Sequence, residues 1–244
     1  MTIVATYPPR RLFRYRSISK NPVSYIEPNG LTFWDRELTA LNEGYLWFAN
    51  FKSMNDPMEG SYEASTRVKR LTRYDDIKAK IYYDKISLGI CSFSETNNNG
   101  PMWAHYADEF RGICIEYSLG PFSKLLAQHK ARFNTLMNLV RVTYSEDRYR
   151  LSRAATDDDD VAQQILSFKS HRWLHEREWR LFKKGAGKFS LSQNCVSHIY
   201  FGNRMNPNDI GKFKSGLRLK DIPVSRMKLK GYSIEFDRLK AADK

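Results

Sequence analysis

Short apolar runs alternate irregularly with short helical patterns along the whole chain, and this irregularity restricts the fold more than any other feature. A regular strand–helix alternation would predict a parallel sheet, because parallel strands are joined by crossover helices. The order here predicts instead an α+β fold with a mostly antiparallel, split β core and short flanking helices. The expected strands are 12–16, 45–49, 86–93, 112–117, 140–144, 178–182, 196–201, 224–229 and 232–236, and the expected helices are 75–83, 102–108, 161–166 and 207–215.

Length and composition are compatible with a globular protein that buries a sizeable core. The chain has 244 residues, of which 41% are apolar and 14% aromatic, so whole-chain disorder is excluded. Internal repeats and low-complexity linkers are absent, and we therefore expect a single domain over 1–244.

Several segment types are absent from the sequence. Apolar runs such as 45–49 are far shorter than the ~20 residues that cross a bilayer. Pro8, Pro9 and Arg10 interrupt the place where an export signal would be apolar, and the three cysteines have no CxxC spacing. We expect a cytoplasmic protein with neither a disulfide framework nor a metal site.

The formal net charge is +13. A chain this basic favours polyanionic partners such as nucleic acid, acidic membrane surfaces or phosphate-rich ligands. The simpler interpretation is that the charge keeps the protein soluble.

The first expected strand carries two arginines on one face. Side chains alternate along a strand, so Arg14 and Arg16 share a face while Tyr15 points to the other. Two arginines in a core strand require an anion or several carbonyls as partners. The alternative is an edge strand whose arginines face water.

A polar turn follows the second expected strand. Asn55 and Asp56 precede a proline, which is typical of a turn held by side-chain hydrogen bonds to the backbone. Asp56 and Glu59 are also candidates to face a cleft.

The middle of the chain contains a second group of candidate site residues. Ser92 and Ser94 share one face of a strand, and Trp103 and Tyr106 share one side of a helix. His105 lies beside them as a candidate proton donor or acceptor, or as a packed or capping histidine.

A pair of carboxylates appears late in the sequence. If Glu176 and Glu178 enter a strand, they share a face and Arg177 points away. Neighbouring carboxylates repel, so they pair with cations or serve proton and carbocation chemistry. A purely structural or sensing domain would pair them with Arg177 or Arg180.

Four ordered motifs resemble a bacterial family known only as a domain of unknown function. The motifs are Phe13-Arg14-Tyr15, Met54-Asn55-Asp56-Pro57-Met58-Glu59, Met102-Trp103-Ala104-His105-Tyr106-Ala107 and Glu176-Arg177-Glu178-Trp179-Arg180. They span residues 13 to 180, and the family itself implies no activity.

A second resemblance does imply an activity. Arginine, then Ser-x-Ser, then Glu-x-Glu is similar to the order of motifs in ADP-ribosyltransferases, which bind NAD as a substrate in a split antiparallel core. The resemblance implies that NAD phosphates or ribose are held by Arg14, with Arg16, Tyr15 and Asn55 as further candidates. By the same resemblance, Ser92 orients the nicotinamide ribose with Ser94 in support, and Tyr106 or Trp103 stacks on nicotinamide. Glu178 stabilises the transition state. Glu176 steers or deprotonates the acceptor, and His105 is a further catalytic candidate.

Two functions of different classes therefore follow. The leading hypothesis is an NAD-dependent ADP-ribosyltransferase that modifies a macromolecular acceptor, either nucleic acid or protein. A fixed carboxylate suits this reaction, because positive charge develops on the sugar when the N-glycosidic bond breaks. The alternative is a basic nucleic-acid-binding or nuclease-like module without NAD chemistry, favoured by the net charge and the basic segment after Arg204.

Overall fold

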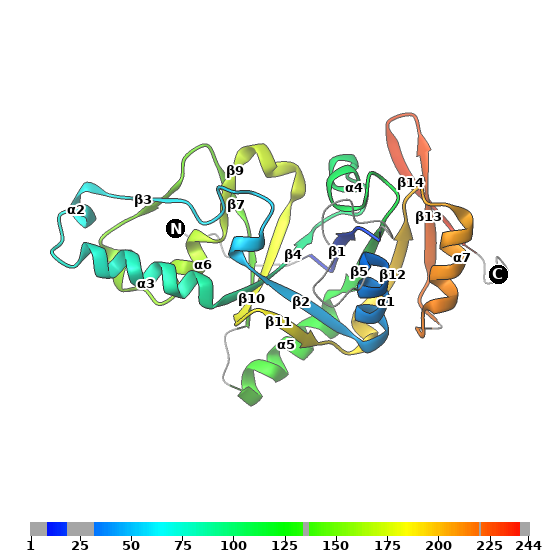
Figure 1. Ribbon diagram of the computed structural model, residues 1–244, viewed down its shortest axis with the longest axis horizontal. Coiled ribbons are helices and arrows are strands. Elements are labelled where there is room, and N and C mark those ends of the chain that lie inside the picture. The colour runs from blue at the N-terminus through cyan, green and yellow to red at the C-terminus, as the bar shows by residue number, and fades with distance from the viewer. Residues whose placement is uncertain (1–8, 19–31, 134–136, 220, 240–244) are drawn as a thin grey trace. The chain divides into compact units, whose positions relative to one another are not determined.

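The computed structural model describes residues 9–18, 32–133, 137–219 and 221–239 (Figure 1). Its contacts divide the chain into two compact units, each built from separate segments. Among the described residues, unit one contains 47–92, 128–133 and 137–188. Unit two contains 9–46, 93–127 and 189–244. The segments of the two units are interleaved along the chain, which explains why the sequence shows no linker.

The sheet of unit two is mostly antiparallel. Its β5 is antiparallel to both β1 and β12, β12 is parallel to β13, and β13 and β14 form an antiparallel hairpin. The last residue of β4, Ser94, pairs with Phe13 on the other side of β1. The strands, in spatial order from β1, are β1 (Arg11–Arg16), β5 (Ile113–Ser118), β12 (Val196–Phe201), β13 (Val224–Lys230) and β14 (Ser233–Arg238).

The helices of unit two begin at residues that cap them. Thr32 and Asp35 form a reciprocal capping box at the start of α1 (Phe33–Glu43), and Asn99 accepts from the amide of Met102 at the start of α4. Proline occupies the first turn of both α4 (Gly100–Tyr106) and α7 (Pro207–Gly216), where its missing N–H costs nothing. The unit also contains the 3₁₀ turn η4 (Gln193–Cys195) and the start of α5 (Leu119–Phe133).

One face of the unit-two sheet packs under α4. Trp103 is fully buried, and its indole meets the ring of Tyr15 edge to face at 5.3 Å. Gly112 lies so close to the chain that an added Cβ would sit 2.3 Å from the carbonyl oxygen of Arg16, so only glycine fits there.

The sheet of unit one contains β2, β4, β6 and β10. Strand β10 pairs with β4 and, antiparallel, with β6, while β2 is antiparallel to β4. The unit also contains two small parallel pairs, β3 with β8 and β7 with β9. The first two residues of β11 belong to unit one as well. The strands are β2 (Tyr45–Asn50), β3 (Tyr62–Ala64), β4 (Leu88–Ser94), β6 (Met137–Arg141), β7 (Thr143–Ser145), β8 (Tyr149–Leu151), β9 (Phe168–Ser170), β10 (Glu178–Lys184) and β11 (Gly187–Ser190).

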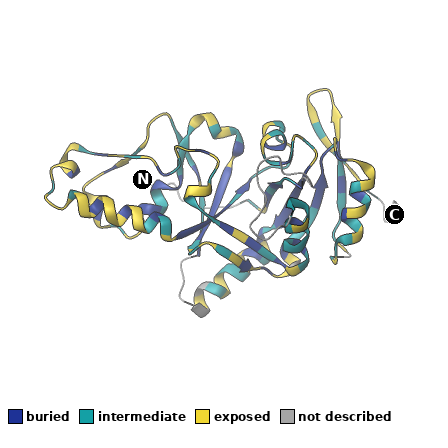
Figure 2. Ribbon diagram, viewed as in Figure 1, coloured by how far each residue is buried: buried dark blue, intermediate teal, exposed yellow. Residues whose placement is uncertain are grey.

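Helix α3 (Tyr74–Ser87) is the longest helix that lies wholly in unit one. Ile77 and Ile81 are one turn apart and pack in a core cluster with Val161 and Ile165 of α6, while the opposite side of the helix is exposed (Figure 2). The shorter helices are η1 (Phe51–Ser53), α2 (Thr66–Lys69), η2 (Ala154–Asp157), α6 (Val161–Ile165) and η3 (His171–Glu176).

The structure confirms the expected fold class, an α+β protein whose large, mostly antiparallel sheet is flanked by short helices. Three α-helices, α1, α2 and α5, were not expected from the sequence. The expected strand 86–93 begins only at Leu88, because Ile86 and Ser87 form the last residues of α3. The expected strand 140–144 is divided between β6 and β7.

Two further observations concern membrane-spanning helices and disulfides. Among the described residues, no helix combines the length and the apolar character that a bilayer span requires. Cys91, Cys114 and Cys195 are all buried, and none of the three forms a disulfide.

Candidate functional site

Five charged side chains meet in the interior of unit one and form what we call the carboxylate cluster. Each of these side chains is at most 6% exposed. Two of them lie two residues apart on β10 and therefore share a face of the strand. The members are Glu59, Lys169 of β9, Glu176 at the end of η3, and Glu178 and Arg180 of β10.

Arg180 is the central cation of the cluster and is completely buried. Its guanidinium donates to both oxygens of Glu59, at 2.6 and 2.8 Å, and to both oxygens of Glu178, at 2.8 and 2.9 Å. It also donates to the carbonyl of Leu166. Burial alone would lower the pKa of Arg180, but Glu178 and Glu59 hold that pKa well above its ordinary value.

Lys169 is the second cation and joins the three carboxylates. Its ammonium lies 2.6 Å from Glu176, 3.5 Å from Glu178 and 3.6 Å from Glu59. It also lies 4.8 Å from the centre of the Trp173 ring, a cation–π distance. Burial acts to lower the pKa of Lys169, but Glu178 and Glu176 raise it, so the lysine stays protonated.

Glu178 remains ionised well below neutral pH. Burial would raise its pKa, but Arg180 and Lys169, helped by a hydrogen bond from Ser92, lower that pKa to about 2. The amide of Glu178 donates to the hydroxyl of Tyr144 at 2.8 Å. With all five groups ionised, the cluster has three negative and two positive charges, a formal excess of one negative charge.

A backbone bend brings the two late carboxylates together. Arg177 has a left-handed conformation with φ of 45°, between the end of η3 and the start of β10. The expectation that Glu176 and Glu178 share one face of a strand is therefore wrong for Glu176, which belongs to η3. Both carboxylates nevertheless reach the ammonium of Lys169.

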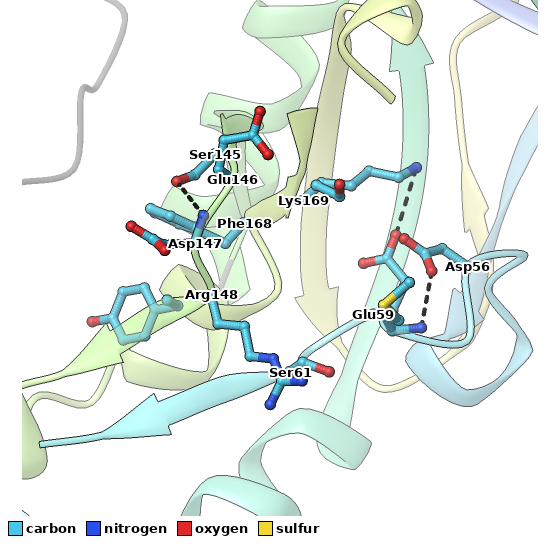
Figure 3. A pocket seen from close by; sticks show the side chains of 12 residues that line it. Asp56, Glu59, Ser61, Ser145, Glu146, Asp147, Arg148, Phe168 and Lys169 are labelled. Carbon is cyan, nitrogen blue, oxygen red and sulfur yellow. Dashed lines mark hydrogen bonds and ion pairs between the residues drawn. The ribbon is translucent and has the colours of Figure 1, made fainter. Parts of the chain in front are cut away.

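A cavity of about 140 Å³ adjoins the carboxylate cluster within unit one (Figure 3). Glu59 and Lys169 belong to both the cavity wall and the cluster, and the close-up shows the ion pair between them. Three more carboxylates and one arginine line the wall, so acidic groups outnumber basic groups there. These additional charged residues are Asp56, Glu146, Asp147 and Arg148, and Tyr149 and Phe168 contribute aromatic rings.

Four of the residues predicted from the sequence lie in unit one: Asn55, Ser92, Glu176 and Glu178. Ser92 donates a hydrogen bond to Glu178, which joins the Ser-x-Ser and Glu-x-Glu motifs in one place. Asn55 is exposed in its turn, and the next residue, Asp56, accepts from the amide of Met58 at 2.9 Å as the turn interpretation predicts. Asp56 and Glu59 line the cavity, as the sequence allowed.

The arginines of the first strand lie in unit two and have internal partners. Arg16 forms an ion pair with Glu37 of α1, whose carboxylate is buried and whose pKa is held down by Arg16 and Arg36 despite burial. The guanidinium of Arg14 lies 5.7 Å from the ring of Phe93. Strand β1 lies between β4 and β5, so the alternative of an exposed edge strand is wrong.

The remaining predicted residues also belong to unit two. Tyr15 donates to the carbonyl of Thr96, and Trp103 donates to that of Asn97, each at 2.7 Å, and both rings are buried in the core. The other three are Ser94, which is buried, Tyr106, which is half-buried against the same core, and His105, which is exposed. The structure brings these residues together in unit two, and their roles remain predictions.

The sequence analysis missed two essential members of the cluster. Lys169 lies on a strand of three residues without a recognisable pattern, so nothing marked it before the fold was known. Arg180 belongs to the Glu-x-Glu-Trp-Arg motif, and the sequence suggested it only as a structural ion-pair partner of the two glutamates. The structure shows that pairing with Glu178. Within the described ranges, no group of His, Cys, Asp and Glu has an arrangement that suits a metal ion.

Fold and site together define an α+β protein with a buried, carboxylate-rich ion cluster beside a small acidic cavity. Residues 102–181 match a protein family described as a protein of unknown function, DUF2971. The match confirms the resemblance to a family of unknown function. It begins in α4 of unit two and ends in β10 of unit one, and it includes all of the cluster except Glu59.

No curated protein and no solved structure matches the chain. The comparisons give no support to the resemblance to ADP-ribosyltransferases. Any activity must therefore be argued from the chemistry of the cluster and the cavity.

Proposed function

We propose that unit one cleaves the bond between nicotinamide and ribose in NAD and transfers the ADP-ribosyl group to a nucleophile on a macromolecule, nucleic acid or protein. The observation that carries the proposal is the hydrogen bond from Ser92 to Glu178, inside a cluster with an excess of negative charge. The proposal uses residues of unit one alone.

The cavity has the character that the nicotinamide end of NAD requires. In NAD the nicotinamide ring is a cation, and the cavity wall carries more carboxylates than basic groups. Phe168 and Tyr149 add aromatic faces, which attract cations. At about 140 Å³ the cavity is smaller than the roughly 300–1,000 Å³ that holds a whole drug-sized ligand. It therefore accepts a single ring, while the rest of the dinucleotide stays outside.

The cluster supplies negative charge where the reaction develops positive charge. When the bond from the ribose C1′ to the ring nitrogen breaks, its electron pair goes to the nitrogen and leaves a neutral nicotinamide and a cationic sugar. A carboxylate held ionised in a dry site stabilises that cation strongly. We assign this role to Glu178, with Ser92 orienting its carboxylate, and we assign the uptake of the acceptor's proton to Glu176. The new bond joins C1′ to the acceptor nucleophile.

The test is nicotinamide release by the purified full-length chain supplied with NAD and a cell extract. We expect Glu178→Gln to lower the release at least about a hundredfold, because removal of one charge-stabilising group typically costs that much. Glu63→Gln is the matched control, since Glu63 is an exposed glutamate of β3 in the same unit.

A second variant separates chemistry from folding, because Glu178 is also an ion-pair partner of Arg180. Glu146→Gln removes a cavity carboxylate that is 77% exposed, so the fold tolerates it, and we expect weaker NAD binding by calorimetry. The proposal is refuted if the wild-type chain neither binds NAD nor releases nicotinamide with any extract.

Nucleic-acid binding without NAD chemistry is the second candidate, and one surface feature of unit one favours it. Tyr82 and Tyr83 of α3 are 42% and 64% exposed, with ring centres 5.8 Å apart, and Lys52 donates to the hydroxyl of Tyr82 at 2.7 Å. Exposed aromatic rings beside a cation can stack on bases while the cation pairs with phosphate.

This second function predicts salt-sensitive binding of a single-stranded oligonucleotide in a filter assay. Tyr83→Ala should weaken that binding about tenfold, the loss expected for one base stacked on an aromatic ring. Tyr232→Ala is the control, because Tyr232 is a fully exposed tyrosine far along the chain in unit two. Binding that is absent, or insensitive to salt, removes this candidate.

A further inference from the structure

A second group of charged side chains lies on one face of the sheet in unit two, around Glu116 of β5. Glu116 is buried and accepts from the hydroxyl of Tyr200 at 2.6 Å and from that of Ser197 at 2.8 Å. The Nε of Arg11 lies a further 3.5 Å from the same carboxylate. Both oxygens of Glu116 therefore have partners inside the protein.

His198 is held in one position beside this carboxylate. It is opposite Glu116 in the pairing of β12 with β5, and its Nε2 lies 2.8 Å from the hydroxyl oxygen of Ser225. Its ring stacks on that of Tyr200, with centres 4.3 Å apart and planes 15° from parallel. Its other nitrogen, Nδ1, has no hydrogen-bond partner among the described residues.

Two exposed arginines lie on either side of His198. In the strand order β1-β5-β12-β13-β14, Arg11 is on β1 and Arg238 is on β14, opposite Ser225. Directly opposed residues share a face of a sheet, so Arg238 points to the same face as Ser225 and His198. The side chain of Arg11 is 65% exposed, and within the described chain Arg238 has no ionic partner.

Alternation along β14 keeps acidic groups away from this face. Glu235 and Asp237 point to the opposite face of the hairpin, where Asp237 lies 3.7 Å from the ammonium of Lys228. The face that carries His198 has two arginines and one carboxylate that is already occupied. Counted over the described residues of this face, two arginines against one carboxylate leave a formal excess of one positive charge, although Arg11 also contacts Glu116.

We propose that this face of unit two binds a phosphate ester, held between Arg11 and Arg238 with His198 beneath it. Guanidinium groups present planar pairs of N–H donors that match phosphate oxygens, and an imidazole adds a third donor when it is protonated. The proposal goes beyond the NAD chemistry of unit one, since none of these residues belongs to that unit.

The charges that face His198 give the site a measurable signature. Burial lowers the pKa of His198, Glu116 raises it, and Arg238 and Arg11 lower it further. Its other neighbours, Tyr200 on the same strand and Ser225 on β13, are uncharged at neutral pH. A bound phosphate offsets the two arginines and so raises the pKa of His198, and phosphate binding is in turn tighter at lower pH.

Calorimetric titration of the full-length chain with inorganic pyrophosphate tests the proposal. We expect Arg238→Ala and Arg11→Ala each to weaken binding about tenfold, the effect of losing one charge-assisted hydrogen bond. Lys228→Ala is the matched control, because Lys228 is an exposed cation on the other face of the same hairpin, and it should leave the affinity unchanged. Proton NMR of His198, assigned with His198→Gln, should show its pKa rising on addition of pyrophosphate.

Two further ligands identify the source of the phosphate. ADP represents a free nucleotide, and a single-stranded oligonucleotide represents a nucleic-acid backbone. Both should compete with pyrophosphate, and the ligand that binds tighter at physiological salt identifies the natural class.

Three results would overturn the site: no binding of pyrophosphate at millimolar concentration, equal weakening by Lys228→Ala, or an unchanged pKa of His198. The titration contains no NAD, so its failure is distinguishable from a failure of nicotinamide release.

Discussion

The carboxylate cluster of unit one and the face of unit two around His198 (Arg11, Glu116, His198 and Arg238), here called the His198 face, use similar side chains with an opposite balance of charge. In the cluster, three carboxylates surround two buried cations, and nearly every polar atom has a partner inside the protein. On the His198 face, a single buried carboxylate accepts from two hydroxyls and contacts Arg11, and both arginines, Arg11 and Arg238, are exposed. The first arrangement favours a cationic group and the second an anionic one. Under the two proposals, the local balance of charges and their burial, rather than the net charge of +13 of the whole chain, decide which ligand each site attracts.

The largest expected effect is that of Arg180→Met, which tests whether the cluster is a buried ion network. We expect it to lower the free energy of unfolding by about 3–5 kcal/mol, because among the described residues it leaves Glu59 and Glu178 buried with Lys169 as their one remaining ion-pair partner. Urea denaturation measures the loss. Arg73→Met is the control in the same unit, since the ion pair of Arg73 with Asp157 is exposed and is worth at most about 1 kcal/mol. Similar losses for the two variants would show that the cluster is not a buried ion network.

Acid should destabilise unit one through Glu178. Its pKa is about 2 in the folded chain and lies at the ordinary value of 4.5 in the unfolded chain, so the folded state favours the ionised form. This stabilisation is fully present above pH 4.5 and is lost as the pH falls toward 2. We expect a loss on the order of 2–3 kcal/mol over that window.

Unfolding free energies at several pH values, for the wild type and for Glu178→Gln, measure the acid effect. The variant has no carboxyl group at this position, so its stability should fall less over the same window. Parallel pH profiles would contradict the assignment of this effect to Glu178.

In unit two, we expect a smaller loss of stability when Tyr200, a partner of Glu116, is changed. Tyr200→Phe removes the hydroxyl that donates to the buried carboxylate at 2.6 Å, and we expect a loss of about 1.5–3 kcal/mol. Ser197 and Arg11 still contact Glu116 in this variant, which keeps the loss below that of Arg180→Met. Thermal or urea unfolding gives the value, and a loss larger than that of Arg180→Met would reverse the comparison.

The smallest expected effect comes from His198. Its pKa is lowered in the folded chain, mainly by burial, so the unfolded chain binds the extra proton more readily. Stability should therefore decline slightly as the pH falls below 6.5, above the range in which Glu178 titrates. His198→Gln should remove this slight decline in stability below pH 6.5, and saturating pyrophosphate should diminish it. If the decline persists in His198→Gln, another titratable group causes it.

The sequence predicted the fold class and most strands because period-two apolar patterns lie in strands that pack on a core. It also predicted the turn at Asp56, since that conformation is set by local hydrogen bonds. It did not predict α1, which begins at a capping box and contacts β1 through the ion pair of Glu37 with Arg16.

The candidate site was less predictable for a physical reason. Glu178 and Ser92 belonged to visible motifs, but the cations that set their charge state depend on long-range pairing. Lys169 reaches the cluster only because β9 pairs with β7, and Glu59 meets Arg180 across 121 positions of the chain. Such contacts leave no local pattern in the sequence.

The separation of Glu59 from Arg180 also has a consequence for synthesis of the chain. A ribosome adds about 5–20 residues per second, so Glu59 is made several seconds before its partner. During this interval Glu59 lacks the guanidinium that it contacts in the folded chain. A fragment limited to the family-matching residues 102–181 has Arg180 without Glu59 and lacks the last three strands of unit two. The matched segment thus lacks parts of both units, so expression work should retain the entire chain.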